Sequence, residues 1–137
     1  MLDELITAEN LSKEFLKSIL DTAYMETSYD EDGDLTVKER CSCFVFPDEE
    51  DKSRIRLMTI FSFKSESSEL DRLQSVNRIN SEYAIVKATV RETDRLVFNW
   101  DIPIAGGITK KAFVLAVKKF CLIPHDAVAD CANDIIF

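Results

Sequence analysis

Two stretches of this chain alternate between apolar and polar residues, and this alternation limits the possible folds more than any other feature of the sequence. In residues 54–64, apolar side chains occupy odd-numbered positions, namely Ile55, Leu57, Phe61 and Phe63. In residues 35–46, the odd-numbered positions are again apolar except for Glu39; they are Leu35, Val37, Cys41, Cys43 and Val45. Because successive side chains of a strand point to opposite faces, the pattern predicts two long strands. The polar loop after Pro47 would join them as a hairpin.

Three other stretches place their apolar residues at helical spacing. They are residues 8–24, with Thr7 or Asn10 as the N-cap, residues 69–81, and residues 112–121, with Thr109 as the N-cap. Pro124 predicts the start of a last short helix, and residues 25–29, 82–90 and 96–102 are typical of further strands. The order αβββαββα(α) contains no βαβ winding. We therefore expect the α+β class, with an antiparallel sheet of about five strands flanked by helices.

The size of the chain predicts one domain over residues 1–137. Of its 137 residues, 46% are hydrophobic, and no linker, repeat or shift in composition divides them. No apolar run approaches the roughly 18 residues that a membrane-spanning helix needs. The acidic N-terminus also lacks the basic and apolar regions of a secretory signal. We therefore expect no membrane insertion and a cytoplasmic location.

The charge of the chain is concentrated near its N-terminus. The formal net charge is −8, and residues 1–34, with ten acids and two bases, carry all of it. Residues 35–137 are neutral as a whole. A nucleic-acid-binding protein needs a basic footprint, and no basic stripe is visible along the sequence, so we expect no nucleic-acid partner. The acidic third is consistent either with solubility or with a basic protein partner.

A series of residues between Leu70 and Phe120 resembles a known family. It comprises a helix that ends in Asn77-Arg-Ile-Asn80, a hairpin with Lys87 and Leu96, the break Asp101-Ile-Pro-Ile-Ala-Gly-Gly-Ile-Thr109, and a helix with Phe113 and Phe120. With the order of the elements, this series resembles the YbjN family of bacterial sensory-transduction regulators. The resemblance implies a fold similar to that of type III secretion chaperones, which are small, acidic, often dimeric proteins that hold other polypeptides. It transfers no catalytic residues.

The most distinctive short motif is the acidic segment 28–39. In the register of a calcium-binding loop, Asp30 and Asp32 take positions three and five, Gly33 takes position six, and Glu39 takes the bidentate twelfth. However, Ser28 stands at position one, and a strand pattern follows Gly33 where a helix is required. We interpret the segment as an acidic β-turn. Calcium binding is the alternative interpretation, with the ligands Asp30, Asp32, Asp34 and Glu39.

The cysteines and the single histidine predict neither a metal site nor a nucleophile. The four cysteines, Cys41, Cys43, Cys121 and Cys131, lack the paired spacing of a zinc site, so we expect reduced, buried thiols. His125 follows Pro124 with no matching carboxylate or nucleophile pattern, which favours an exposed or capping residue. We therefore expect no catalytic residues and no cofactor.

Two further motifs have structural interpretations. Gly106-Gly107 precedes a helix but lacks the spacing of a phosphate-binding loop, which favours a hinge or tight turn. Asn77 and Asn80 lie one helical turn apart, and we expect them to close a helix end or to bind loop backbone.

The second face of the predicted hairpin is unexpectedly apolar toward the loop end. Its residues there are Phe44, Phe46, Met58 and Ile60. An antiparallel sheet covered by helices on one side should be polar on the other. Either a helix wraps round to cover this patch, or the patch contacts a second copy or a client protein.

Together these observations predict a non-enzymatic, chaperone-like or regulatory protein-binding module. We expect it to act as a homodimer through the sheet surface that contains Phe44, Phe46, Met58 and Ile60. The alternative is a sensor domain that binds calcium at the Asp30–Glu39 loop or a small molecule between the sheet and the helices.

Overall fold

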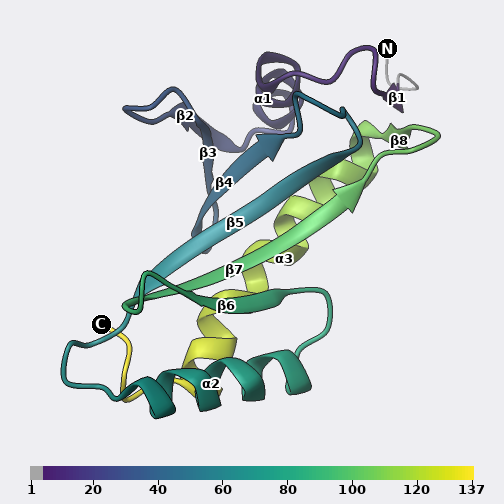
Figure 1. Ribbon diagram of the computed structural model, residues 1–137. Helices are drawn as coiled ribbons and strands as arrows, with labels where there is room; N and C mark the ends of the chain where they lie inside the picture. The colour runs from purple at the N-terminus through teal and green to yellow at the C-terminus, as the bar shows by residue number, and fades with distance from the viewer. Residues whose placement is uncertain (1–4) are drawn as a thin grey trace.

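The computed structural model describes residues 5–137, which contain one six-stranded antiparallel sheet (Figure 1). Neighbouring strands lie in the order β2-β3-β4-β5-β7-β6. This arrangement confirms the α+β class, with six strands where about five were expected. The strands are β2 (Glu26–Tyr29), β3 (Leu35–Lys38), β4 (Ser42–Pro47), β5 (Arg54–Ser62), β6 (Lys87–Arg91) and β7 (Arg95–Pro103).

The additional strand arises because residues 35–46 form two strands instead of one. The chain reverses at residues 39–41, where the Glu39 N–H donates to the Cys41 carbonyl over 3.0 Å. In the resulting hairpin, Leu35 lies opposite Val45 and Val37 lies opposite Cys43. The prediction of one long strand was therefore wrong. Glu39, the only charged residue in the apolar parity, is exposed in the bend. Paired residues share a face, so the predicted alternation of buried side chains survives the reversal.

The helices are α1 (Lys13–Thr22), α2 (Glu69–Glu82) and α3 (Lys110–Cys131). Each begins after a hydroxyl N-cap: the side chains of Ser12, Ser68 and Thr109 accept from the backbone N–H three residues on. The predicted cap Thr109 is thus confirmed, whereas the first helix begins later than expected. Asn10 instead accepts from the Thr7 N–H and donates to the Leu5 carbonyl, which holds the preceding turn.

The predicted helix break before Pro124 was also wrong, because α3 is continuous through it. Proline lacks the N–H that would bond to the carbonyl of Phe120, and an interior proline costs a helix about 3 kcal/mol. Pro124 itself is buried, and the neighbouring Phe120 and Ala127 are fully buried. Packing against the sheet therefore offsets the lost hydrogen bond.

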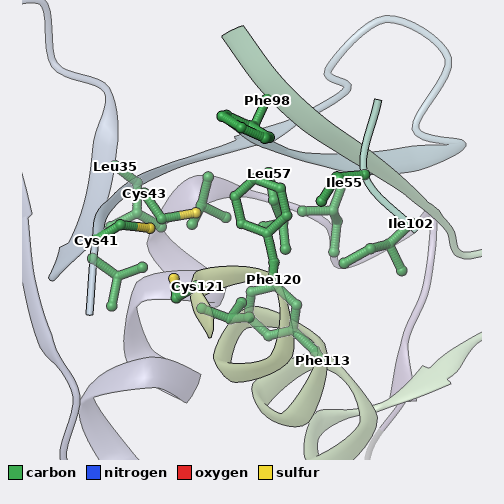
Figure 2. Close-up of a cluster of buried hydrophobic side chains, with 14 of the residues drawn as sticks. Leu35, Cys41, Cys43, Ile55, Leu57, Phe98, Ile102, Phe113, Phe120 and Cys121 are labelled. Carbon is green, nitrogen blue, oxygen red and sulfur yellow. The ribbon is translucent and has the colours of Figure 1, made fainter. Parts of the chain in front are cut away.

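All three helices pack on one face of the sheet, which we call the helix-covered face. Figure 2 shows Phe113 and Phe120 of α3 directed toward Leu57 and Phe98 of the sheet. In Figure 1, α3 passes behind β5 and β7, while α1 and α2 lie toward opposite ends of the sheet. At the β2 end, Lys13 and Lys17 of α1 lie over the Tyr29 ring. The core is therefore a single layer between sheet and helices. Among the described residues, no helix packs on the other face.

A short ribbon, formed by β1 (Leu5–Ile6) and β8 (Ile108–Thr109), pairs the N-terminal segment with the residues just before α3. The predicted tight turn at Gly106-Gly107 is confirmed. Both residues have positive φ angles, +80° and +86°, and the Gly107 N–H donates to the Ile104 carbonyl over 2.8 Å. A Cβ at Gly107 would lie 2.9 Å from Cδ1 of Leu5, so the ribbon leaves no room for a side chain there.

Candidate functional site: the open face of the sheet

The face of the sheet opposite the helices is the candidate site, and we call it the open face. Strand register defines its members, because residues paired across strands share a face. One row is formed by Phe44, Met58, Asn99 and Lys87, and the next by Phe46, Arg56 and Asp101. The charged and polar remainder includes Glu26, Ser28, Thr36, Lys38, Ser42, Arg54, Ser62, Thr89, Arg91 and Arg95.

The four residues predicted as an interface all lie on this face. Phe44, Phe46, Met58 and Ile60 are each half-buried. The Phe44 and Phe46 rings are stacked in parallel, with centroids 5.5 Å apart. Of the two interpretations of this patch, the described residues do not support the one in which a helix covers it. We call these four residues the apolar patch.

Two hollows flank the apolar patch. The first, of about 340 Å³, is lined by Phe46, Pro47 and Met58, by Arg54, Arg56 and Arg91, and by one carboxylate, that of Asp48. Arg91 lies on β6, three strands away from Phe46 of β4, so the twist of the sheet brings the edge strand β6 toward β4 at this hollow. The second hollow, of about 370 Å³, is lined by Phe44 and Ile60 and reaches Cys41, Thr59 and His125. Each pair of apolar-patch residues therefore borders its own concavity.

The open face is basic on an otherwise acidic protein. Its strand residues comprise two carboxylates and six cations, a net charge of +4 against −8 for the chain; the cations are Lys38, Arg54, Arg56, Lys87, Arg91 and Arg95. Asp101 receives a bidentate pair of hydrogen bonds from Arg56, at 2.7 and 3.0 Å, and a third contact from Arg54 at 3.3 Å. The Arg56 hydrogen bonds hold the pKa of Asp101 below its usual range.

Two polar atoms on this face are buried without a hydrogen-bond partner among the described residues. They are Nδ2 of Asn99 and Oγ1 of Thr89. Asn99 is only 3% exposed, although it belongs to the open face, because it lies in the central row between Met58 and Lys87. An unsatisfied buried amide costs about 1–3 kcal/mol. The amide nitrogen of Asn99 therefore weakens the fold at this position unless a neighbouring acceptor moves toward it.

Neither the six cations of the open face nor the burial of Asn99 was predicted from the sequence. The six cations are spread over residues 38–95, where acids between them cancel their charge along the chain. The only local signal was the polar parity of residues 54–64, which contains Arg54 and Arg56 beside Met58 and Ile60.

The comparisons with known proteins identify the family of this chain. The family model described as "YbjN: Putative bacterial sensory transduction regulator" matches residues 12–121, which is most of the sequence. The chain belongs to the YbjN family. A comparison with curated proteins found no match.

Two solved structures share the fold. A YbjN protein from E. coli, described as "a putative transcription regulator", aligns with a TM-score of 0.76 and 15% identity over 93% of this chain and 96% of its own. An uncharacterized protein from Methanothermobacter thermautotrophicus aligns with a TM-score of 0.62 and 14% identity over 90% of this chain and 99% of its own. Because both identities are so low, these two structures show that the fold is shared and show nothing about function. The predicted likeness to type III secretion chaperones stays a prediction.

In this YbjN-family chain, the acidic turn brings together three of the four proposed calcium ligands. The carboxylates of Asp30, Asp32 and Asp34 lie within 4.8 Å of one another. Glu39 lies beyond the far end of β3 and is not part of this cluster. Asp30 Oδ1 already accepts hydrogen bonds from the N–H groups of Asp32 and Asp34, and the Lys13 ammonium donates to the Gly33 carbonyl over 2.7 Å. These contacts are typical of a capped β-turn.

The thiols lie where the sequence predicted, in the core. Cys41, Cys43 and Cys121 are buried, and Figure 2 shows their sulfurs turned toward one another, while Cys131 is half-buried. A hydrogen bond with Cys121, followed by burial, raises the pKa of the Cys41 thiol. A thiol with a raised pKa is mostly protonated and is a poor nucleophile. This environment is that of structural cysteines.

His125 is exposed within α3, and its ring meets the Phe61 ring edge-on with centroids 5.3 Å apart. The prediction that it lies at a helix start was wrong, since α3 begins fifteen residues earlier at Lys110.

The two asparagines of α2 differ in role. Asn80 bonds to the backbone of Ala88 in β6 through both ends of its amide, at 2.8 and 3.0 Å, whereas Asn77 is exposed and its side chain makes no hydrogen bond within residues 5–137. The expectation of a backbone contact is thus confirmed for Asn80, with strand backbone as its target.

Proposed function

We propose that this YbjN-family protein is a non-enzymatic regulatory module that binds another polypeptide on its open face. The observation that carries the proposal is the apolar patch: four half-buried apolar side chains on a sheet face that no described helix covers. Exposed, contiguous apolar surface of this kind marks sites of contact with other proteins. The family's description, which names a regulator rather than an enzyme, supports the same class of function.

The sheet presents this surface in a rigid, preformed state. The apolar patch is held by β4 and β5, which pair with each other and with β3 and β7 on either side. A partner that buries apolar area here gains about 25 cal/mol per Å², and a stable interface requires about 800 Å² on each partner. Because the strands are already ordered, little of that gain is lost to ordering the site.

The occupant that we predicted from the sequence is a second copy of the chain, which gives a homodimer. The test is the mass of the purified protein by light scattering, measured for the native chain and for the double variant Phe44→Asp with Ile60→Asp. A dimer that becomes a folded monomer supports the homodimer. Circular dichroism verifies that the variant is folded.

A matched control carries the same charges on the helical side. Leu70 and Leu73 of α2 are 63% and 50% exposed, so Leu70→Asp with Leu73→Asp adds two carboxylates away from the open face. We expect this control to keep the native mass. A native chain that is already monomeric excludes the homodimer, and binding of a different polypeptide then becomes the remaining form of the proposal. A dimer whose mass is unchanged by the open-face variant removes this surface from consideration.

Calcium sensing by the acidic turn is the second candidate, and the convergence of Asp30, Asp32 and Asp34 favours it. Calorimetry with calcium tests it, with Asp32→Ala as the variant. Calcium takes six to eight oxygen ligands, and the Lys13 ammonium bonds beside the turn at Gly33. We therefore expect no heat of binding at millimolar calcium; a saturable heat that Asp32→Ala abolishes would restore the sensor function.

Within residues 5–137, no helix combines the length and apolarity needed to cross a bilayer. A cytoplasmic location stays part of the proposal, and it places the open face among cytoplasmic polypeptides.

A further inference from the structure

We propose that the open face recognises an acidic polypeptide segment, one that carries carboxylates beside apolar side chains. This inference deepens the proposed function and rests on it, because it names the chemistry of the partner. Three features of the open face support it: its charge, the make-up of the hollow lined by Arg54, Arg56 and Arg91 (the arginine hollow), and the unsuitability of other occupants.

The charge of the open face selects an anionic partner. The strand residues of the open face carry a net charge of +4 in a chain whose net charge is −8. Two loop carboxylates, Asp48 and Glu92, lie within 4 Å of Arg54 and Arg95, and the face is still cationic when both are counted. Charge complementarity raises the association rate and excludes partners of the wrong sign. An acidic segment is attracted to this face and repelled by the acidic remainder of the protein, so the charge distribution also directs it to the open face.

The arginine hollow combines apolar and cationic walls. Phe46 and Met58 lie beside the guanidinium groups of Arg54, Arg56 and Arg91. Arg54 and Arg56 share the carboxylate of Asp101, and Arg54 also lies 3.9 Å from the Asp48 carboxylate at the wall of the hollow. Arg91 forms no ion pair with any described residue, so its guanidinium group is the one left for a ligand. A guanidinium group can bind a carboxylate through two parallel hydrogen bonds. The hollow therefore suits an apolar side chain with a carboxylate next to it.

A second copy fits the open face less well than a separate acidic segment. A twofold dimer through this face would place six cations opposite six cations. A copy that docked through its acidic turn would bring only residues 30–34, which are Asp-Glu-Asp-Gly-Asp and contain no apolar side chain for either hollow.

A nucleic acid also fits less well. Double-stranded DNA carries a phosphate charge about every 1.7 Å of its axis, so it would extend beyond the basic face onto the acidic parts of the protein. The Phe44 and Phe46 rings, moreover, stack on each other instead of presenting separate platforms for bases.

The test is fluorescence anisotropy with labelled probes and the full chain. The first probe is a dodecapeptide in which glutamate alternates with leucine and phenylalanine, and the second is the same peptide with glutamine for glutamate. A thymidine dodecamer is the third probe and supplies negative charge without apolar side chains. We expect the glutamate peptide to bind about tenfold more tightly than the glutamine peptide, and more weakly as salt rises.

Matched variants locate the binding. Lys87→Gln with Arg91→Gln removes two exposed cations from the open face, and Lys118→Gln with Lys119→Gln removes two exposed cations from α3, so both variants have the same net charge. We expect the first to weaken binding of the glutamate peptide about tenfold and the second to leave it within about twofold. Equal effects of the two variants would overturn the inference, as would tighter binding of the thymidine dodecamer.

The inference and the proposed function can fail separately. If the two peptides bind equally and Phe44→Asp with Ile60→Asp abolishes both, the acidic partner is excluded while binding of polypeptides by the open face stands. If neither peptide binds, the inference is overturned, and the proposed function is judged by light scattering alone.

Discussion

Asn80 takes the place of a neighbouring strand at the β6 edge of the sheet. Its Oδ1 accepts from the Ala88 N–H over 2.8 Å, and its Nδ2 donates to the Ala88 carbonyl over 3.0 Å. β6 is the last strand of the sheet, so these two backbone groups have no strand partner on that side. Exposed edge groups are a template for pairing with other chains. The amide of Asn80 therefore both fastens α2 to the sheet and closes this part of its edge.

The replacement Asn80→Ala removes both hydrogen bonds. Each contributes about 1 kcal/mol to the free energy of unfolding, so their loss costs about 2 kcal/mol. Alanine is favoured over asparagine inside a helix by about 0.5 kcal/mol, which offsets part of this cost. We therefore expect Asn80→Ala to lower the free energy of unfolding by about 1.5 kcal/mol.

Asn77→Ala is the matched control, because Asn77 lies one turn earlier in α2 and is exposed. It should gain about 0.5 kcal/mol from helix propensity alone, so the two variants should differ by about 2 kcal/mol. Urea denaturation followed by circular dichroism measures both. If the two variants unfold at the same urea concentration, the Asn80 amide does not hold the edge strand and the reasoning is refuted.

Three other perturbations test separate parts of the structure. Tyr24 is 97% exposed and follows α1 with φ +63°, in a Schellman motif in which the Met25 N–H donates to the Leu20 carbonyl. Glycine adopts this left-handed conformation without the strain of a side chain, so Tyr24→Gly should raise the free energy of unfolding by about 1 kcal/mol. Urea denaturation measures this change, and an unchanged free energy would contradict the prediction. The hydrogen bond from the Tyr83 hydroxyl to Asp130 raises the pKa of Tyr83 to about 12. Ultraviolet titration of Asp130→Asn should show that pKa moving down toward 10, and an unmoved titration curve would count against the contact. The Arg56 hydrogen bonds lower the pKa of Asp101 in the folded state. The pair therefore stabilises the fold at pH values above the carboxyl pKa of the unfolded chain, about 4, and this stabilisation is lost as the pH falls toward the lower pKa of the folded state. Asp101→Asn should accordingly show a smaller loss of stability between about pH 5 and pH 3 than the native chain, and equal losses would argue against the pairing.

The positions that are buried were largely predictable from the sequence. The parity of Leu35, Val37, Ile55 and Leu57 was correct, as were the N-cap Thr109 and the turn at Gly106-Gly107. Periodicity and capping depend on residues close together in the chain, so a single sequence contains them.

The continuity of α3 and the reversal at residues 39–41 were not predictable in this way. Pro124 favours a break locally, and burial of Phe120 and Ala127 against the sheet offsets that preference. Likewise, one extended strand and a tight hairpin give the same alternation over residues 35–46, and only pairing with β5 distinguishes them.

The sequence by itself therefore determined the class of fold, the buried parity of β3, β4 and β5, and the apolar patch that contains Phe44 and Ile60. Only the tertiary structure decided that this patch stays open and that its surroundings are basic. Along the chain, residues 35–137 are neutral, because their 15 cations are balanced by 15 acids. Strand pairing separates these charges in space: it places Lys38, Arg56 and Arg91, which are far apart in the sequence, on one face. Register is a long-range property, so the electrostatic character of this face exists only once the sheet has formed.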